Sequence, residues 1–268
     1  MSYFTFEQHQ IYYQESGEGA PLLLLHGNTA SSNMFYGFTE AYEKSYRVIL
    51  IDFLGHGKSD RLDEFPADLW FYEAQQVLAF LKHKKYSQVN IIGTSGGALV
   101  AINVALEAGS LVKKVIADSF EGEYPLKAFT DTVEADREAS KQDFDARMFY
   151  EYMHGDDWER IVDQDTRAIQ RHQKEIGRFF HKELNQLKAD IYLTGSKADE
   201  FVCAVSPDYF ETVYGAMLKS IGHGEMHVFD AGKHPAMLSN PEAFYQLSTA
   251  FLAADKQSSN RGVNHERM

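Results

Sequence analysis

Ser95 stands in a setting that suits a nucleophile. A short apolar run, Val89 to Ile92, ends in Gly93-Thr94-Ser95-Gly96-Gly97, and a stretch of small apolar residues then follows at helical spacing. Glycines two residues before and two residues after a serine permit the sharp strand-to-helix turn called the nucleophile elbow. Such a turn exposes the serine hydroxyl and places the next backbone N–H beside it, as a donor to developing negative charge. The simpler interpretation is a glycine–serine turn that caps an ordinary helix.

A serine hydroxyl becomes a useful nucleophile only when a base takes its proton and a third group holds that base. His234, in the loop after the last predicted strand, is the predicted general base. Asp199, four residues after Gly195, is the predicted acid that orients it. Asp118 is the alternative acid, because it also follows an apolar run. The catalytic residues are therefore expected in the chain order Ser, Asp, His.

The negative charge that forms on a substrate carbonyl during attack needs donors. We expect the backbone N–H groups of Gly96 and Asn28 to supply them, since Asn28 follows the apolar run 22–25. The Asn28 side chain is predicted either to add a donor or to brace its loop. His26 and Asp52 are interpreted as structural residues that brace glycine-rich turns.

The elements that must position these residues are visible as continuous apolar runs, which predict strands buried on both faces. The predicted strands are a hairpin over 3–14 and runs at 22–25, 46–51, 89–92, 112–117, 191–193 and 226–229. They alternate with helical patterns, which predicts an α/β protein with a mostly parallel, twisted central sheet and helices on both faces. Ligands of such sheets bind beyond the carboxyl ends of the strands. Every candidate residue follows a predicted strand, so all are expected to meet at that edge.

The composition changes after the sixth predicted strand. Residues 119–188 contain helical patterns rich in charged and aromatic residues, without a strand-like run. We interpret this segment as a helical cap inserted into a core made of residues 1–118 and 189–254. The polar tail, residues 255–268, is predicted to be disordered.

Five short motifs together resemble the α/β-hydrolase superfamily. They are His26-Gly27-Asn28, Asp52-Phe53-Leu54-Gly55-His56-Gly57-Lys58-Ser59, Gly93-Thr94-Ser95-Gly96-Gly97, Gly195-Ser196-Lys197-Ala198-Asp199 and Gly232-Lys233-His234-Pro235. The resemblance implies the α/β-hydrolase fold, with the helical segment similar to the cap of that superfamily, but it does not define a substrate. Ser95 excludes the members that use an aspartate nucleophile. Many relatives carry a larger residue after the nucleophile, so Gly96 implies a roomier pocket above the serine.

The composition restricts the partners. The chain has 39 acidic and 26 basic residues and a formal net charge of −13, which argues against nucleic acid or an anionic membrane surface as the main partner. Cys203 is the single cysteine, so neither an intramolecular disulfide nor a cysteine metal cluster is expected, and no metal or cofactor is predicted. The sequence shows neither a secretory signal nor the about 20 apolar residues of a membrane span. A cytoplasmic protein is predicted, and its state as a monomer or a dimer is left open.

The sequence therefore predicts a serine hydrolase that cleaves a small, uncharged or apolar ester, or a related acyl compound, through an acyl-enzyme on Ser95. Acidic residues outnumber basic ones by 16 to 11 over residues 120–188, which disfavours an anionic substrate. The open alternatives are a C–C bond hydrolase, an aminopeptidase-like amidase, a cofactor-free lyase or oxygenase and a non-catalytic small-molecule-binding protein. An amine substrate would need an acidic partner, and the candidates are Glu121, Glu123, Asp156 and Asp157, each of which is also interpreted as a solvated surface residue. A C–C bond hydrolase would need basic residues for a carboxylate, and the candidates are Arg147, Arg160, Arg167, Arg171 and Arg178.

Overall fold

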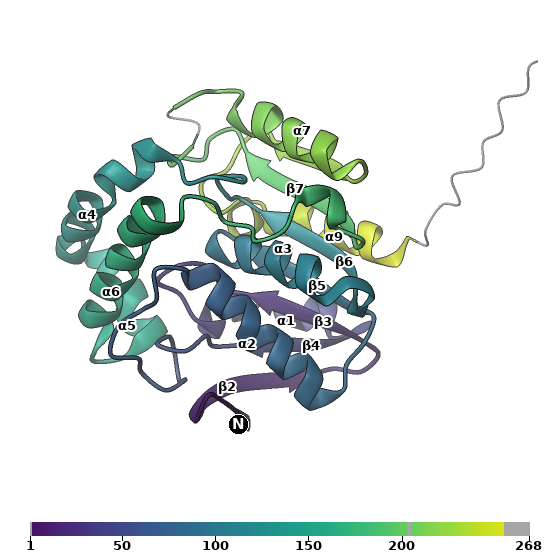
Figure 1. The fold of residues 1–268 in the computed structure, drawn as a ribbon, viewed down its shortest axis with the longest axis horizontal. Helices are drawn as coiled ribbons and strands as arrows, with labels where there is room; N and C mark the ends of the chain where they lie inside the picture. The colour runs from purple at the N-terminus through teal and green to yellow at the C-terminus, as the bar shows by residue number, and fades with distance from the viewer. Residues whose placement is uncertain (1, 203–204, 255–268) are drawn as a thin grey trace, which may run out of the picture.

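The computed structural model describes residues 2–202 and 205–254, and a central sheet runs through them (Figure 1). Its eight strands lie in the order β1-β2-β4-β3-β5-β6-β7-β8. The strands are β1 (Ser2–Phe6), β2 (His9–Ser16), β3 (Ala20–Leu25), β4 (Tyr46–Ile51), β5 (Val89–Thr94), β6 (Val112–Asp118), β7 (Asp190–Ser196) and β8 (Glu225–Phe229).

The sheet is mostly parallel, as the sequence predicts. From β4 to β8 every pair of neighbours is parallel, whereas β2 runs antiparallel to both β1 and β4. The predicted hairpin therefore forms one edge of the sheet. The parallel strands all end on one side, so the residues that follow β3, β5, β6, β7 and β8 meet there.

Helices cover both faces of the sheet because successive side chains of a buried strand point to opposite sides. Leu23 and Leu25 belong to a core on one face, and Leu22 and Leu24 belong to a second core on the other. The first core is covered by α2 (Leu69–Lys84), α3 (Gly96–Ala108) and α7 (Tyr209–Ile221). The second is covered by α1 (Thr39–Tyr42), α8 (Ala236–Ser239) and α9 (Pro241–Ala253). The predicted fold class is confirmed.

The segment between β6 and β7 is helical and lies at one end of the sheet (Figure 1). It contains α4 (Lys127–Gln142), α5 (Phe144–His154), α6 (Trp158–Arg171) and two short turns, η3 (His172–Ile176) and η4 (Leu184–Gln186). Two further short turns in the core are η1 (Ser32–Phe35) and η2 (Gly109–Leu111). Within the described part of the chain, no helix has both the length and the hydrophobicity needed to cross a membrane.

The predicted disordered tail, residues 255–268, lies outside the described residues, and so does Cys203.

Candidate active site

Ser95 lies on a sharp turn between β5 and α3, in a backbone conformation that side chains rarely adopt. Its φ is 55° and its ψ is −127°, and its N–H donates to the carbonyl of Asp118 at 2.8 Å. A Cβ at Gly93 would overlap the carbonyl oxygen of Gly97, and one at Gly97 would overlap the carbonyl oxygen of Leu25. The two glycines of the predicted motif are therefore required by close backbone approach. The turn holds Ser95 at the carboxyl end of the sheet.

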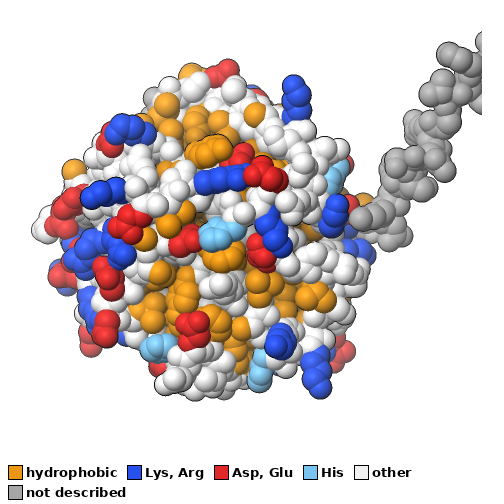
Figure 2. All heavy atoms as spheres, viewed as in Figure 1, with side chains coloured by type: hydrophobic (Ala, Val, Ile, Leu, Met, Phe, Trp, Pro, Cys, Tyr) orange, Lys and Arg blue, Asp and Glu red, His pale blue; other side chains and the backbone are white. Residues whose placement is uncertain are grey.

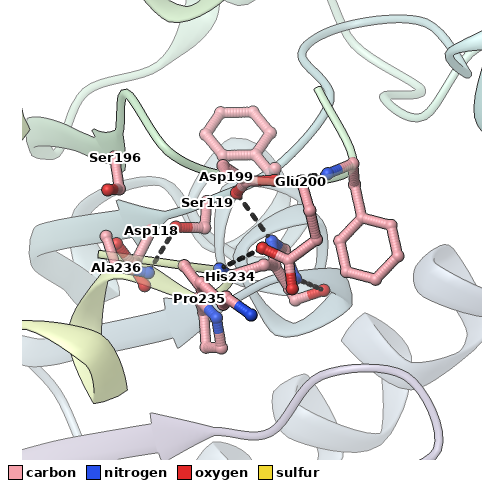
Figure 3. A network of polar contacts seen from close by, with 12 residues as sticks. Asp118, Ser119, Ser196, Asp199, Glu200, His234, Pro235 and Ala236 are labelled. Atoms are coloured by element: carbon pink, nitrogen blue, oxygen red, sulfur yellow. Dashed lines mark hydrogen bonds and ion pairs between the residues drawn. The ribbon is translucent and has the colours of Figure 1, made fainter. Parts of the chain in front are cut away.

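His234 and Asp199 lie next to Ser95, although they come from loops far apart along the chain. The distance between His234 Nε2 and Ser95 Oγ is 3.0 Å, and that between His234 Nδ1 and Asp199 Oδ2 is 2.8 Å. Asp199 also accepts the Phe201 N–H at 3.0 Å, and Glu200 accepts the His234 backbone N–H at 3.0 Å. Figure 3 shows the Asp199 and Glu200 carboxylates directed at His234.

The environment of His234 makes its imidazole more basic. Burial alone would lower the pKa of His234, but the hydrogen bond and the charge of Asp199 outweigh burial, and the pKa is raised above its ordinary value. Because Asp199 can only accept a hydrogen bond, Nδ1 of His234 carries a proton. In neutral His234, Nε2 is then free to accept the Ser95 hydroxyl proton.

The alternative acid, Asp118, is engaged elsewhere. Its carboxylate accepts hydrogen bonds from Thr94 Oγ1 at 2.9 Å, Thr194 Oγ1 at 2.8 Å and the Met237 N–H at 3.0 Å. Burial raises the pKa of Asp118 to about 6. Of the two predicted acids, the structure brings only Asp199 to His234, while Asp118 ties together the ends of β5, β6 and β7.

Asn28 and Gly96 lie side by side next to Ser95. The Asn28 side chain braces its loop: its Nδ2 donates to Asp165 at 3.0 Å, and its Oδ1 accepts from Trp70 Nε1 at 3.2 Å. A Cβ at Gly96 would overlap Asn28 Oδ1 and lie 2.8 Å from Trp70 Nε1. Asn28 and Trp70 thus fill the space that a side chain at position 96 would take, so the absence of that side chain does not by itself enlarge the pocket above Ser95.

The two predicted structural residues brace turns as expected. His26 is buried, its Nε2 accepts the Phe53 N–H at 3.2 Å, and burial holds the pKa of its imidazole well below its ordinary value. Asp52 accepts the Ser32 N–H at 2.7 Å and the Lys58 N–H at 2.8 Å. Both residues therefore fix the loops around Asn28.

A cavity of about 500 Å³ opens onto Ser95 and His234. Its wall is built by the core loops and by α4, α5 and α6, which contribute Phe129, Tyr150 and Ile169 among others. Two charged residues, Glu121 and Arg137, also line it. Among the described residues, no three His, Cys, Asp or Glu side chains gather as metal ligands.

Residues 20–155 match the family model described as the alpha/beta hydrolase fold. This chain belongs to the α/β-hydrolase family. Among curated proteins, human Serine hydrolase BPHL is 25% identical over 250 residues, which cover 91% of this α/β-hydrolase and 83% of the human protein. The 2-hydroxy-6-oxo-6-phenylhexa-2,4-dienoate hydrolase of Comamonas testosteroni is 24% identical over 270 residues, which cover 90% of this chain and 91% of that hydrolase.

A solved structure agrees in fold. The esterase EaEST of Exiguobacterium antarcticum superposes with a TM-score of 0.71 at 22% identity, over 92% of this chain and 96% of the esterase. The two curated proteins are named as hydrolases, and only the second of these names specifies a substrate. The comparisons therefore support a hydrolase without fixing its substrate.

The five arginines that were candidates for binding the carboxylate of a C–C hydrolase substrate do not line the cavity of this α/β-hydrolase. Arg147 pairs with Glu151, Arg171 with Glu64, and Arg178 with Glu123, and Figure 2 shows acidic and basic side chains mixed over the helical segment. None of the five predicted arginines lines the cavity. The cavity arginine is Arg137, which the sequence reasoning missed.

Two missed residues interrupt apolar faces of helices. Asp165 has apolar residues four positions before and after it in α6, Ile161 and Ile169, and all three are buried. Arg137 lies four residues after buried Val133 in α4. A charged residue on the apolar face of a predicted helix is the signal that would have identified both.

Proposed function

We propose that this chain is a serine hydrolase that cleaves a small ester or a related acyl compound through an acyl-enzyme on Ser95. The observation that carries the proposal is the contact of one imidazole with two groups. His234 Nε2 lies 3.0 Å from Ser95 Oγ while Nδ1 lies 2.8 Å from Asp199 Oδ2. This is the geometry in which a base takes a serine proton and a carboxylate holds the base in one tautomer.

In the proposed first half-reaction, Ser95 Oγ attacks the substrate carbonyl carbon and passes its proton to His234 Nε2. The backbone N–H groups of Asn28 and Gly96 donate to the oxyanion that forms. His234 then returns the proton to the leaving alcohol as the carbon–oxygen bond breaks, which leaves the acyl group on Ser95. In the second half, His234 takes a proton from water, the hydroxide attacks the acyl carbon, and Ser95 leaves with the proton.

The helical segment, residues 119–188, is proposed to be a cap on a core of residues 1–118 and 189–254. It supplies aromatic side chains, including Phe129, Phe149 and Tyr150, to the cavity wall. An aromatic wall favours an apolar acyl or alcohol group, because burial of apolar surface contributes about 25 cal/mol per Å². The size of this cavity is therefore proposed to set the substrate range.

Glu121 supports a second candidate, hydrolysis of an ester or amide that carries an amine. It lines the cavity, its Oε2 accepts the Leu126 N–H at 3.1 Å, and burial raises its pKa to about 7. A substrate ammonium group would stabilise the Glu121 carboxylate. The C–C hydrolase alternative has less support, because the cavity cation, Arg137, already lies 3.2 Å from Asp165.

The proposal is tested with a fluorophosphonate probe followed by p-nitrophenyl esters of increasing chain length. We expect one label on Ser95, lost in Ser95→Ala and kept in Ser110→Ala, a matched change at an exposed serine in η2. Esters with and without an amino group then distinguish the two candidates. Folded wild-type protein that neither labels nor hydrolyses any ester would contradict serine hydrolysis and favour a binding protein.

A further inference from the structure

A buried carboxylate outside the Ser95–His234–Asp199 group lies behind the loop that carries Asn28. The Asp165 side chain, in α6, is 0% exposed. Its Oδ2 accepts a hydrogen bond from Asn28 Nδ2 at 3.0 Å, and its Oδ1 lies 3.2 Å from Arg137 Nη2. Asn28 belongs to a core loop and Arg137 to α4, so Asp165 joins three separate parts of the molecule.

Asp165 is held in its charged form. Burial by itself would raise the pKa of Asp165, but the charge of Arg137, together with His56 and Asn28, outweighs burial and lowers it. His56 also separates Asp165 from Glu73, with ring nitrogens 3.9 Å from each carboxylate. Burial and the charge of Asp165 raise the pKa of Glu73 well above its ordinary value. The pKa shifts of the two carboxyl groups thus run in opposite directions, and Asp165 is the one whose charged form the surroundings stabilise.

The contact with Asp165 fixes the direction of the Asn28 amide. Asn28 Nδ2 faces the carboxylate, and Oδ1 faces Trp70 Nε1, a group that can only donate. A reversed amide would oppose two donors at Trp70 and two acceptors at Asp165. Asn28 is therefore clamped between the helical segment and the core, with its Oδ1 against Gly96.

We propose that Asp165 is a positioning residue that sets the oxyanion donor Asn28 from the helical segment; this inference rests on the proposed serine hydrolase function. Asp165 does not line the cavity, whereas its two partners, Asn28 and Arg137, do. Its contact with Asn28 acts on the transition state, where the oxyanion forms, and therefore on kcat. Its contact with Arg137 holds a cation in the cavity wall and therefore acts on KM.

Two substitutions separate these effects. Asp165→Ala removes both contacts, and we expect kcat for a p-nitrophenyl ester to fall by about 10- to 100-fold, somewhat less than the loss of an oxyanion donor itself. Asp165→Asn keeps an amide oxygen that accepts from Asn28 Nδ2 but loses the charge that holds Arg137. We expect it to retain kcat within about threefold and to raise KM. Equal losses of kcat in both variants would overturn the proposal.

A double-mutant cycle tests whether Asp165 acts through Asn28. Asn28→Ala keeps the backbone N–H and removes the side chain that Asp165 holds. If both changes affect one clamp, Asp165→Ala combined with Asn28→Ala is no slower than the slower single variant, within about threefold. If the fall in kcat of the double variant equals the product of the falls in the two single variants, Asp165 acts by another route, and the proposal is overturned.

The matched control is Asp163→Ala, at a residue of the same helix whose 42% exposed side chain pairs with Lys141 outside the cavity. We expect it to leave kcat and KM at wild-type values. Asp165→Ala leaves Arg137, a largely covered cation with a 12% exposed side chain, without its carboxylate partner. Asp165→Ala with Arg137→Met is therefore made as a second variant, and thermal unfolding verifies that each variant is folded.

Hydrogen exchange of residues 26–31 gives a measurement that does not depend on catalysis. We expect faster exchange of these amides in Asp165→Ala but not in Asp165→Asn or Asp163→Ala. If the wild-type protein hydrolyses no ester, the proposed function fails and the exchange data alone decide the role of Asp165. Unchanged exchange in Asp165→Ala would overturn that role even in an active enzyme.

Discussion

At the scale of single residues, Asp199 and Asp118 show how two buried carboxylates after neighbouring strands serve different ends. Asp199 faces His234 Nδ1, and Asp118 accepts from two threonines and a backbone N–H. In Asp199→Asn, an amide N–H facing Nδ1 would favour the wrong tautomer of His234. We therefore expect kcat to fall by about 10⁴-fold. Steady-state kinetics with a p-nitrophenyl ester measure the loss.

The matched change, Asp118→Asn, should behave differently. Its amide oxygen accepts from Thr94 and the Met237 N–H, and its NH₂ group donates to the Thr194 hydroxyl, which rotates to accept. Activity within about threefold of the wild type is therefore expected. A large loss in Asp118→Asn with a small one in Asp199→Asn would reverse the assignment of the acid.

Asp118 also makes stability depend on pH. Its pKa of about 6 in the folded protein lies above the ordinary value of 3.8, because burial disfavours the charged form. The folded state therefore binds more protons, and this group lowers stability as the pH rises from about 4 to 6. Asp118→Asn removes the penalty, so we expect its free energy of unfolding to exceed that of the wild type by about 1 to 3 kcal/mol at pH 8. At pH 4, urea unfolding should give the same free energy of unfolding for Asp118→Asn and the wild type. If the two proteins differ in this free energy by the same amount at pH 4 and at pH 8, titration of Asp118 is excluded as the cause.

The positions of Asp165 and Arg137 mark the limit of sequence reasoning at this scale. The sequence could predict Ser95, His234 and Asp199 because each of them follows a strand of a parallel sheet. The carboxyl ends of such strands lie at one edge of the sheet, so the position of each residue is fixed. Asp165 and Arg137 reach Asn28 and the cavity only through the packing of α4 and α6 on the core loops. No local pattern encodes that docking.

At the scale of elements, the apolar runs made the sheet predictable, because strands buried on both faces need continuous apolar sequence. The packing of the helical segment was less predictable. Its helices, α4, α5 and α6, carry charge on their exposed faces, and the pattern of apolar residues can indicate an inward face but not which part of the core that face meets. The surroundings of Gly96 were hard to predict for the same reason: Asn28 and Trp70, which fill the space of a side chain there, come from other elements.

The turn between β5 and α3 gives a prediction at this scale. In Gly96→Ala the new Cβ overlaps Asn28 Oδ1, so the Asn28 side chain must shift, and the contacts with Asp165 and Trp70 that brace the loop of the proposed oxyanion donor are disturbed. We expect kcat to fall by about tenfold or more. The control is Gly215→Ala in α7, where a Cβ meets nothing within 4 Å. That change should raise the free energy of unfolding by about 0.5 to 1 kcal/mol, and equal kinetic losses in both variants would contradict the argument.

At the scale of the whole molecule, the helical segment is fastened to the core mainly along α5 and α6. Ser31 Oγ donates to the Met153 carbonyl at 3.0 Å, and His154 Nε2 lies 3.0 Å from the Thr29 carbonyl oxygen. These contacts join the loop that carries Asn28 to the C-terminal end of α5. The placement of the segment and the geometry of the site therefore depend on each other.

Arg61 also joins the helical segment to the core. Its Nε and Nη2 donate to both carboxylate oxygens of Asp157 at 2.8 and 2.9 Å, and Nη2 also donates to the His154 carbonyl at 3.0 Å. Arg61→Ala should lower the free energy of unfolding by about 1 to 3 kcal/mol, because the bidentate pair and a charge-assisted bond are lost. KM should rise several-fold with a smaller change in kcat, since the cavity wall loosens while Ser95 and His234 stay on the core. Arg147→Ala, which removes only an exposed pair within α5, should leave the free energy of unfolding and KM at their wild-type values. If Arg61→Ala and Arg147→Ala change the free energy of unfolding and KM by the same amounts, the core does not hold the helical segment through Arg61.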